Sequence, residues 1–203
     1  YGCFMDVNVY GGPKGYLSQI ISWVSKESYF FRWRYVLPFV IALWLYFIVG
    51  HSLKGVMLVG TLGLIASYST VYRRVLRIPG SIELVTLGTV LTAVAYGPIA
   101  GALFGIITTI TSEIISSEVN AFTPLYTFGR GVIGVAAFYL ASLNIVTLGI
   151  AMVLLFNIIT QSLRWLLGDV EQVIEGVYFF TTNSIFNILA FFVLGNFLLS
   201  VMT

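Results

Sequence analysis

The stretch that decides the fold covers residues 84–112 and reads LVTLGTVLTAVAYGPIAGALFGIITTITS. It contains no Asp, Glu, Lys or Arg. An apolar helix rises about 1.5 Å per residue, so roughly 20 residues cross a hydrocarbon layer of about 30 Å. The run is too long for one ordinary span, and proline disfavours helical geometry in the residue before it. The sequence therefore predicts two membrane helices that meet in a very short turn at Gly97-Pro98.

Other charge-free runs place the whole chain in the same class. They cover residues 35–50, 55–72, 131–163 and 176–203. With 59% hydrophobic and 9% charged residues, the chain has too little polar surface to coat a soluble domain of 203 residues. The sequence predicts an all-α fold, a polytopic transmembrane bundle of about seven helices, in a multi-pass protein of the cell membrane.

The bundle is expected to occupy residues 35–203. Its predicted spans are 35–50, 55–72, 82–96, 99–115, 124–143, 145–167 and 176–202, with an acidic loop at 168–175. Residues 1–34 are expected to form an interfacial segment, because Leu17, Ile20, Ile21 and Val24 recur at helical spacing with serines between them.

Composition and motifs argue against several classes of function. A formal net charge of only +2 makes nucleic acid an improbable partner, and the single cysteine, Cys3, allows neither an internal disulfide nor a cysteine metal site. The sequence has no paired-histidine motif, no Gly-x-Ser-x-Gly elbow and no phosphate-binding loop. We therefore expect a protein that is not an enzyme and uses no metal or cofactor.

The scarce charges fall on one face when the spans alternate through the membrane. That face would carry residues 1–34 and the loops at 73–83, 113–123 and 164–175. The positive-inside rule makes it cytoplasmic, because it holds most of the Lys and Arg residues. Alternatively, it is a binding face where charged side chains from three loops meet over a cavity.

Small residues follow the Gly-Pro turn at helical spacing. Gly97, Gly101 and Gly105 form a flat ridge, and Gly63 and Ser67 give a similar small face to the span at 55–72. Such ridges let helices approach closely. Packing inside the bundle is the simpler interpretation, and docking onto another membrane subunit is the alternative.

Residues from 78 onward are similar to a known family. The quoted features are Ile78-Pro79-Gly80, the run AYGPIAGALFG at 95–105, Phe122-Thr123-Pro124, Phe128-Gly129-Arg130-Gly131, and the paired Asn183 and Asn187. Together they resemble the substrate-binding S components of energy-coupling factor (ECF) transporters, with a more distant likeness to the rod-shape protein MreD. The resemblance implies a six-helix core at about 55–203, uptake of a small vitamin-like solute, and an ECF-type transmembrane and ATPase module as partner.

The chain departs from that family in two respects. It has an additional predicted span before the core, and the Ala-x-x-x-Ala docking motif expected on the first core helix is absent from residues 55–72. By family analogy the charged face would be extracellular, opposite to the positive-inside interpretation. These departures favour a second hypothesis, a non-catalytic scaffold or accessory subunit of a larger membrane complex.

The candidate solute-binding residues are the charged side chains nearest the predicted spans, namely Glu83, Glu113, Arg130 and Arg164. Charge inside a membrane protein is costly unless it is used or paired. We expect both arginines to point into the bundle, with Glu113 as partner of Arg130 and with Glu83 or Glu175 as partner of Arg164. The alternative to solute binding is that these residues form structural ion pairs or reach lipid headgroups.

Overall fold

All regular secondary structure in the described part of the chain is helical. The computed structural model describes residues 53–73, 82–168 and 170–203. These residues belong to one compact unit, His51–Thr203. The predicted interfacial segment at 1–34 and the predicted span at 35–50 lie outside the described residues.

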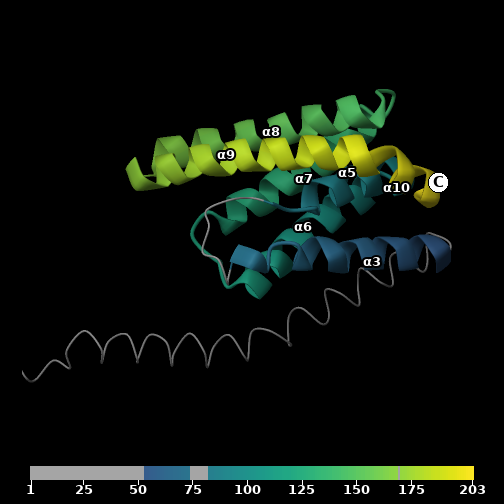
Figure 1. Ribbon diagram of the computed structural model, residues 1–203, viewed down its shortest axis with the longest axis horizontal. Helices are drawn as coiled ribbons and strands as arrows, with labels where there is room; N and C mark the ends of the chain where they lie inside the picture. Colours follow the sequence, from purple (N-terminus) through teal and green to yellow (C-terminus); the bar gives the residue numbers. More distant parts are fainter. Residues whose placement is uncertain (1–52, 74–81, 169) are drawn as a thin grey trace, which may run out of the picture. The chain divides into compact units, whose positions relative to one another are not determined.

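The helices follow the predicted order. They are α3 (Leu53–Tyr68), α5 (Val85–Tyr96), α6 (Pro98–Ser116), α7 (Thr123–Tyr139), α8 (Ile145–Leu167), α9 (Val170–Ala190), the π-helix η2 (Phe191–Gly195) and α10 (Asn196–Met202). Figure 1 shows α8 and α9 along one side of the bundle and α3 along the other, with α5, α6 and α7 between them.

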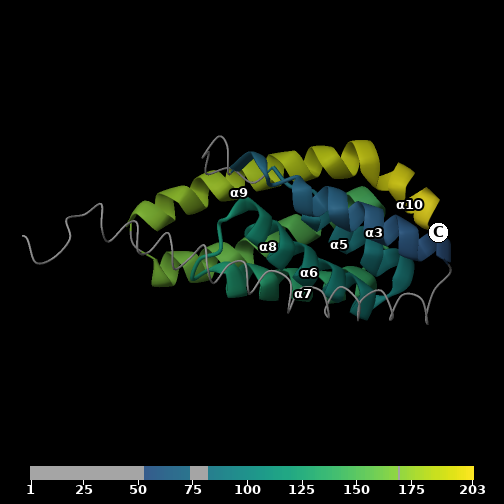
Figure 2. The same cartoon turned by 90° about the horizontal axis from the view of Figure 1, so that it is seen from below.

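Helix α5 is the centre of the bundle. Its residues from Val85 to Ala93 are all buried, so no face of this stretch reaches the surface. A helix that is apolar all round is typical of such a position. It packs against α6 and α7, and also contacts α3, α8, α9 and α10. Figure 2 shows the same arrangement from below, with α5 enclosed by its neighbours.

The Gly-Pro turn is confirmed. Helix α5 ends at Tyr96 and α6 begins at Pro98, with only Gly97 between them. Gly97 has a φ of 102°, a conformation that side-chain-bearing residues rarely adopt, and proline suits the first turn of the helix that follows. The corner therefore depends on both residue types.

Small residues let the helices of the hairpin approach closely. A Cβ atom added to Gly101 would lie 2.4 Å from Cβ of Ala93 in α5, as the predicted close contact requires. One added to Gly105 would lie 3.0 Å from the carbonyl oxygen of Arg130 in α7. Gly63 faces Phe104, and Ser67 is buried. Packing inside the bundle thus accounts for these four positions.

The last helix differs from the predicted span. It is continuous from Val170 to Met202 and includes the π-helical turn η2, so the predicted acidic loop at 168–175 is wrong over most of its length. Glu171 lies in the first turn of α9, where a carboxylate stabilises the positive end of the helix dipole. The acidic residues therefore begin the helix.

Three helices in the described residues are long and apolar enough to cross a membrane. They are α6, α8 and the continuous helix from α9 to α10. Lys54–Tyr68 and Val85–Tyr96 are apolar but shorter. These lengths support membrane association, and the count of about seven spans stays a prediction.

Candidate functional site: a buried charged cluster

A cluster of charged side chains is buried at the end of the bundle where α6 ends and α7 begins. Its five members come from different elements. Arg73 follows α3 and Glu83 precedes α5, whereas Glu113 lies on α6, Arg130 on α7 and Arg164 on α8. All five are buried. The fold thus brings together all four predicted site residues, and adds Arg73, which the sequence placed only in a charged loop.

Arg130 is the most deeply buried charge of the cluster, with 2% of its surface exposed. Its guanidinium donates hydrogen bonds to the Glu83 carboxylate and to the Thr86 hydroxyl. The guanidinium carbon lies 3.8 Å from the centre of the Phe156 ring, in a cation–π contact. The prediction that Arg130 points into the bundle and meets a carboxylate is confirmed.

The predicted partner of Arg130 is wrong, because the carboxylate is that of Glu83 and not Glu113. The backbone of Arg130 faces Gly105 of α6. Glu113 lies about 12 Å further along the α6 axis, at 1.5 Å per residue. From the level of Gly105, the Arg130 side chain extends to Glu83 at the start of α5. Helices α5 and α7 pack against each other.

Glu83 is held by donors from three helices. Besides Arg130 on α7, it accepts hydrogen bonds from the Thr86 hydroxyl at 3.3 Å and from Nδ2 of Asn183 on α9 at 3.0 Å. A buried carboxylate is tolerated only when it is paired and hydrogen-bonded. Glu83 therefore links α5, α7 and α9 at this end of the bundle.

Arg164 forms a second, more peripheral pair. Its guanidinium donates to Glu175 at 2.6 Å and to the Tyr126 hydroxyl at 3.0 Å. Glu175 was one of the two predicted partners, and its side chain is 48% exposed. Solvent reaches this pair from the Glu175 side.

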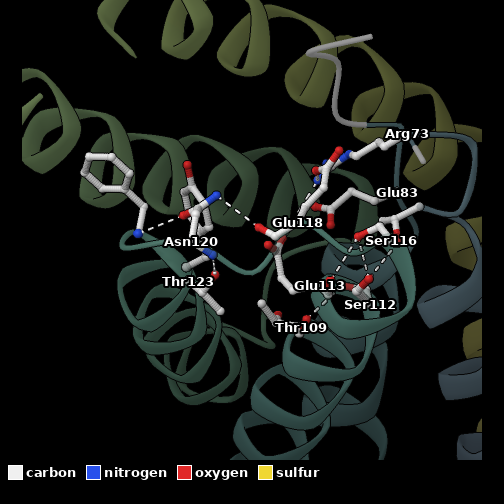
Figure 3. Close-up of polar contacts among 12 residues, drawn as sticks. Arg73, Glu83, Thr109, Ser112, Glu113, Ser116, Glu118, Asn120 and Thr123 are labelled. Atoms are coloured by element: carbon white, nitrogen blue, oxygen red, sulfur yellow. Dashed lines mark hydrogen bonds and ion pairs between the residues drawn. The ribbon is translucent and has the colours of Figure 1, made fainter. Parts of the chain in front are cut away.

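Arg73 lies near two further carboxylates. Nη1 of Arg73 is 3.2 Å from Glu118 and 3.8 Å from Glu113. Figure 3 shows the Glu83, Glu113 and Glu118 side chains converging on one region below Arg73. Burial lowers the pKa of Arg73, but the nearby carboxylates of Glu83 and Glu118 raise it, and the net shift is upward. This guanidinium therefore stays charged.

These side chains surround a very small cavity of about 10 Å³. Three of the predicted site residues line it, and Arg164 does not. The complete wall is Thr70, Arg73, Glu83, Thr109, Ser112, Glu113, Tyr126, Arg130, Phe156 and Phe179. A space of this size matches one water-sized group.

A line of buried amide side chains extends from the cluster between α8 and α9. Asn157 Nδ2 donates to Asn183 Oδ1 and to Ser184 Oγ, each at 3.2 Å. Gln161 is buried, and neither its Oε1 nor its Nε2 has a hydrogen-bond partner. Asn183 and Asn187 were predicted to matter only through the family resemblance. Asn157 and Gln161, four residues apart inside an apolar run, were the signal that the prediction missed.

The arrangement suits noncovalent binding. In the described ranges, no group of three or more His, Cys, Asp or Glu side chains could hold a metal ion. The charged and hydroxyl groups can instead hold a polar solute through hydrogen bonds and ion pairs. Comparisons with protein-family models, curated proteins and solved structures found no match to this chain, so the resemblance to S components stays a prediction.

Proposed function

We propose that this chain is a membrane-embedded subunit that binds a small, water-soluble, vitamin-like solute at the charged cluster, in the manner of an ECF S component. The observation that carries the proposal is the burial of three arginines and two glutamates at one end of the bundle. Such charge is costly to bury, and in membrane proteins it commonly marks a solute or ion site. The protein would be a multi-pass protein of the cell membrane, acting with an ECF-type transmembrane and ATPase module.

The walls of the cavity supply what recognition of a polar solute requires. Carboxylates, guanidinium groups and hydroxyls stand beside the aromatic rings of Tyr126, Phe156 and Phe179. Tyr126 and Phe179 are stacked, with ring centres 5.6 Å apart. Aromatic surfaces combined with a few polar groups are typical of small-molecule sites.

Binding of a whole vitamin-like solute would require the cavity to widen. Ligand pockets usually enclose about 300 Å³ or more, far above the 10 Å³ found here. The Arg73–Glu118 pair is the best-placed element to open, because Glu118 is 36% exposed and lies in the loop between α6 and α7. Separation of this pair would connect the cavity to solvent.

Thermal unfolding of the purified full chain in lipid nanodiscs tests the proposal. A solute that binds only the folded form must raise its melting temperature. We would screen water-soluble vitamins and then repeat any hit with Glu113→Gln, which alters the cavity wall, and with Glu175→Gln, which lies outside it. Loss of the response in Glu113→Gln alone would support the proposal. Failure of every vitamin to stabilise the wild type would contradict it.

A scaffold role is the second candidate, and a surface groove favours it. The groove of about 480 Å³ runs over α6 and α7 and is lined by Ala102, Ile106, Phe128, Gly131, Val132, Val135 and Ala136. Small residues on its floor would let a helix of another membrane subunit pack closely. Stoichiometric co-purification with a membrane complex that lacks an ATPase would favour this role, and capture of an ECF-type ATPase would favour solute uptake.

The orientation of the charged face can be measured directly. The chain has a single cysteine, Cys3, so an impermeant thiol reagent applied to sealed vesicles labels one position. Labelling from outside would place the N-terminus there. With the number of spans known, this decides between the cytoplasmic and extracellular interpretations of the charged face.

A further inference from the structure

Three of the four hydroxyl groups that line the cavity donate their protons to backbone carbonyls. Thr109 Oγ1 donates to the Gly105 carbonyl at 2.7 Å, and Ser112 Oγ donates to the Thr109 carbonyl at 2.9 Å. Thr70 Oγ1 donates to the Ser67 carbonyl at 3.2 Å. A hydroxyl has one proton and two lone pairs. These three groups therefore offer acceptors to the cavity. Figure 3 marks the bond between Ser112 and Thr109 with a dashed line.

The guanidinium groups of the wall also have carboxylate partners. Arg130 donates to Glu83, and Arg73 donates to Glu118. The hydrogen bonds of these two guanidinium groups thus go to Glu83 and Glu118, and Glu113 forms a longer ion pair with Arg73. Glu113 lies 3.8 Å from Arg73, beyond normal hydrogen-bond length, although it is buried in the wall. It is the lining carboxylate best placed to accept from a ligand.

We propose that the cavity receives the primary ammonium group of a small solute, with Glu113 as its counter-ion and the hydroxyl oxygens of Thr109 and Ser112 as further acceptors. An ammonium group carries three donors and no acceptor, which complements such a wall. Its size is close to that of water, and the cavity holds one water-sized group. This inference rests on the proposed solute-binding function and specifies the chemistry of the bound group.

The rest of the solute would lie toward the Arg73–Glu118 side, where the cluster meets the loop between α6 and α7. Nε of Arg130 is buried and has no acceptor. A hydroxyl or carbonyl oxygen adjacent to the ammonium group would accept from it. The site therefore favours an amine with a neighbouring oxygen over a simple carboxylic acid.

Thermal unfolding of the full chain in nanodiscs with four probes at equal ionic strength tests the inference. The probes are methylammonium chloride, tetramethylammonium chloride, sodium chloride and sodium acetate. Methylammonium should raise the melting temperature in a saturable way, by roughly 5 to 10 °C at about 100 times Kd. Tetramethylammonium has the same charge but no N–H donor, so it should behave like sodium.

Two variants locate the effect. Glu113→Gln should abolish the methylammonium response, and Thr109→Val, which keeps the side-chain shape, should weaken it about tenfold in Kd, the loss of one good hydrogen bond. Glu175→Gln, outside the cavity, should leave the response unchanged. If Glu113→Gln fails to fold, Thr109→Val still decides the matter.

Other outcomes would overturn the inference in distinguishable ways. Equal stabilisation by tetramethylammonium would mean that charge alone is recognised at another surface. Stabilisation by acetate but not methylammonium would overturn the ammonium assignment and leave the solute-binding function standing. No response to any of the four probes, with a vitamin still stabilising the protein, would likewise overturn only the ammonium assignment.

Discussion

The two ends of helix α5 are held by different physical means. At its start, Glu83 joins α5 to α7 and α9 through charged and polar hydrogen bonds. At its end, the Gly97-Pro98 corner and the contact between Gly101 and Ala93 join α5 to α6 through close backbone packing. The start of α5 depends on charged side chains, and its end depends on small residues that let the backbones approach closely.

This difference affects what each end can do. Closely packed backbone has few alternative arrangements, because even one added methyl group must displace its neighbours. Ion pairs and hydroxyl groups can exchange partners with a solute at moderate cost. The glycine-rich end is therefore expected to be the more rigid one, and the charged end is where the proposed binding would occur.

The largest expected effect is at the rigid end. Gly101→Leu should prevent folding or reduce yield severely, because a Cβ at this position would also lie 2.7 Å from Cα of Ala93. Backbone at that distance cannot move aside as a flexible side chain can. Yield and monodispersity after purification in detergent measure the effect.

Gly60→Leu is the matched control for Gly101→Leu. Gly60 is exposed on α3, and a Cβ there would meet no atom within 4 Å. It should purify like the wild type. A normal yield for Gly101→Leu, or an equal loss for both variants, would show that close packing at the corner is not what holds this end together.

The next effect concerns the buried pair at the charged end. Arg130→Met or Glu83→Gln should each cost about 3–5 kcal/mol, because each leaves an unpaired partner in a buried site. The double variant should cost clearly less than the sum of the two. Unfolding free energies for all four proteins of the cycle would measure this coupling. Additive losses would mean that the two side chains do not depend on each other.

The corner was predictable from sequence because its causes are local. Glycine and proline act on the backbone within one or two residues, so AYGPIAG at 95–101 specifies both the break and the close approach that follows. The residue that accepts from Arg130 depends instead on how α5, α6 and α7 are rotated about their axes. Sequence spacing favoured Glu113, and the packing of Arg130 against Gly105 selected Glu83.

The start of α9 and the buried amides between α8 and α9 also depend on packing that sequence spacing does not specify. A cluster of acidic residues is compatible with a solvated loop or with a helix N-terminus; a loop was predicted, and the structure has a helix from Val170. Asn157 and Gln161 were overlooked because isolated amides in apolar runs have meaning only when a facing helix supplies polar partners. Asn183 and Ser184 on α9 supply those of Asn157.

A smaller effect is expected at the rim of the charged end. Glu175→Gln should cost about 1 kcal/mol at low salt, because Glu175 is half exposed and Arg164 keeps its bond to Tyr126. Salt screens exposed charge, so the difference from wild type should shrink in about 1 M NaCl. Thermal unfolding at two salt concentrations measures it. A salt-independent loss as large as that of Glu83→Gln would show that the two pairs belong to one buried network.

The smallest effect is expected at the rigid end, from Tyr96→Phe. The Tyr96 hydroxyl donates to the Met202 carbonyl at 3.1 Å, which joins the end of α5 to the end of α10. Removing it should cost about 0.5–1 kcal/mol, because water can solvate the freed carbonyl at this partly buried site. The loss should be the same at low and high salt, unlike that of Glu175→Gln, because no charge is involved. Tyr96→Ala should cost more, since the ring packs beside Gly55 at the start of α3. A strong salt dependence for Tyr96→Phe would mean that charge contributes at both ends, and the contrast between them would then fail.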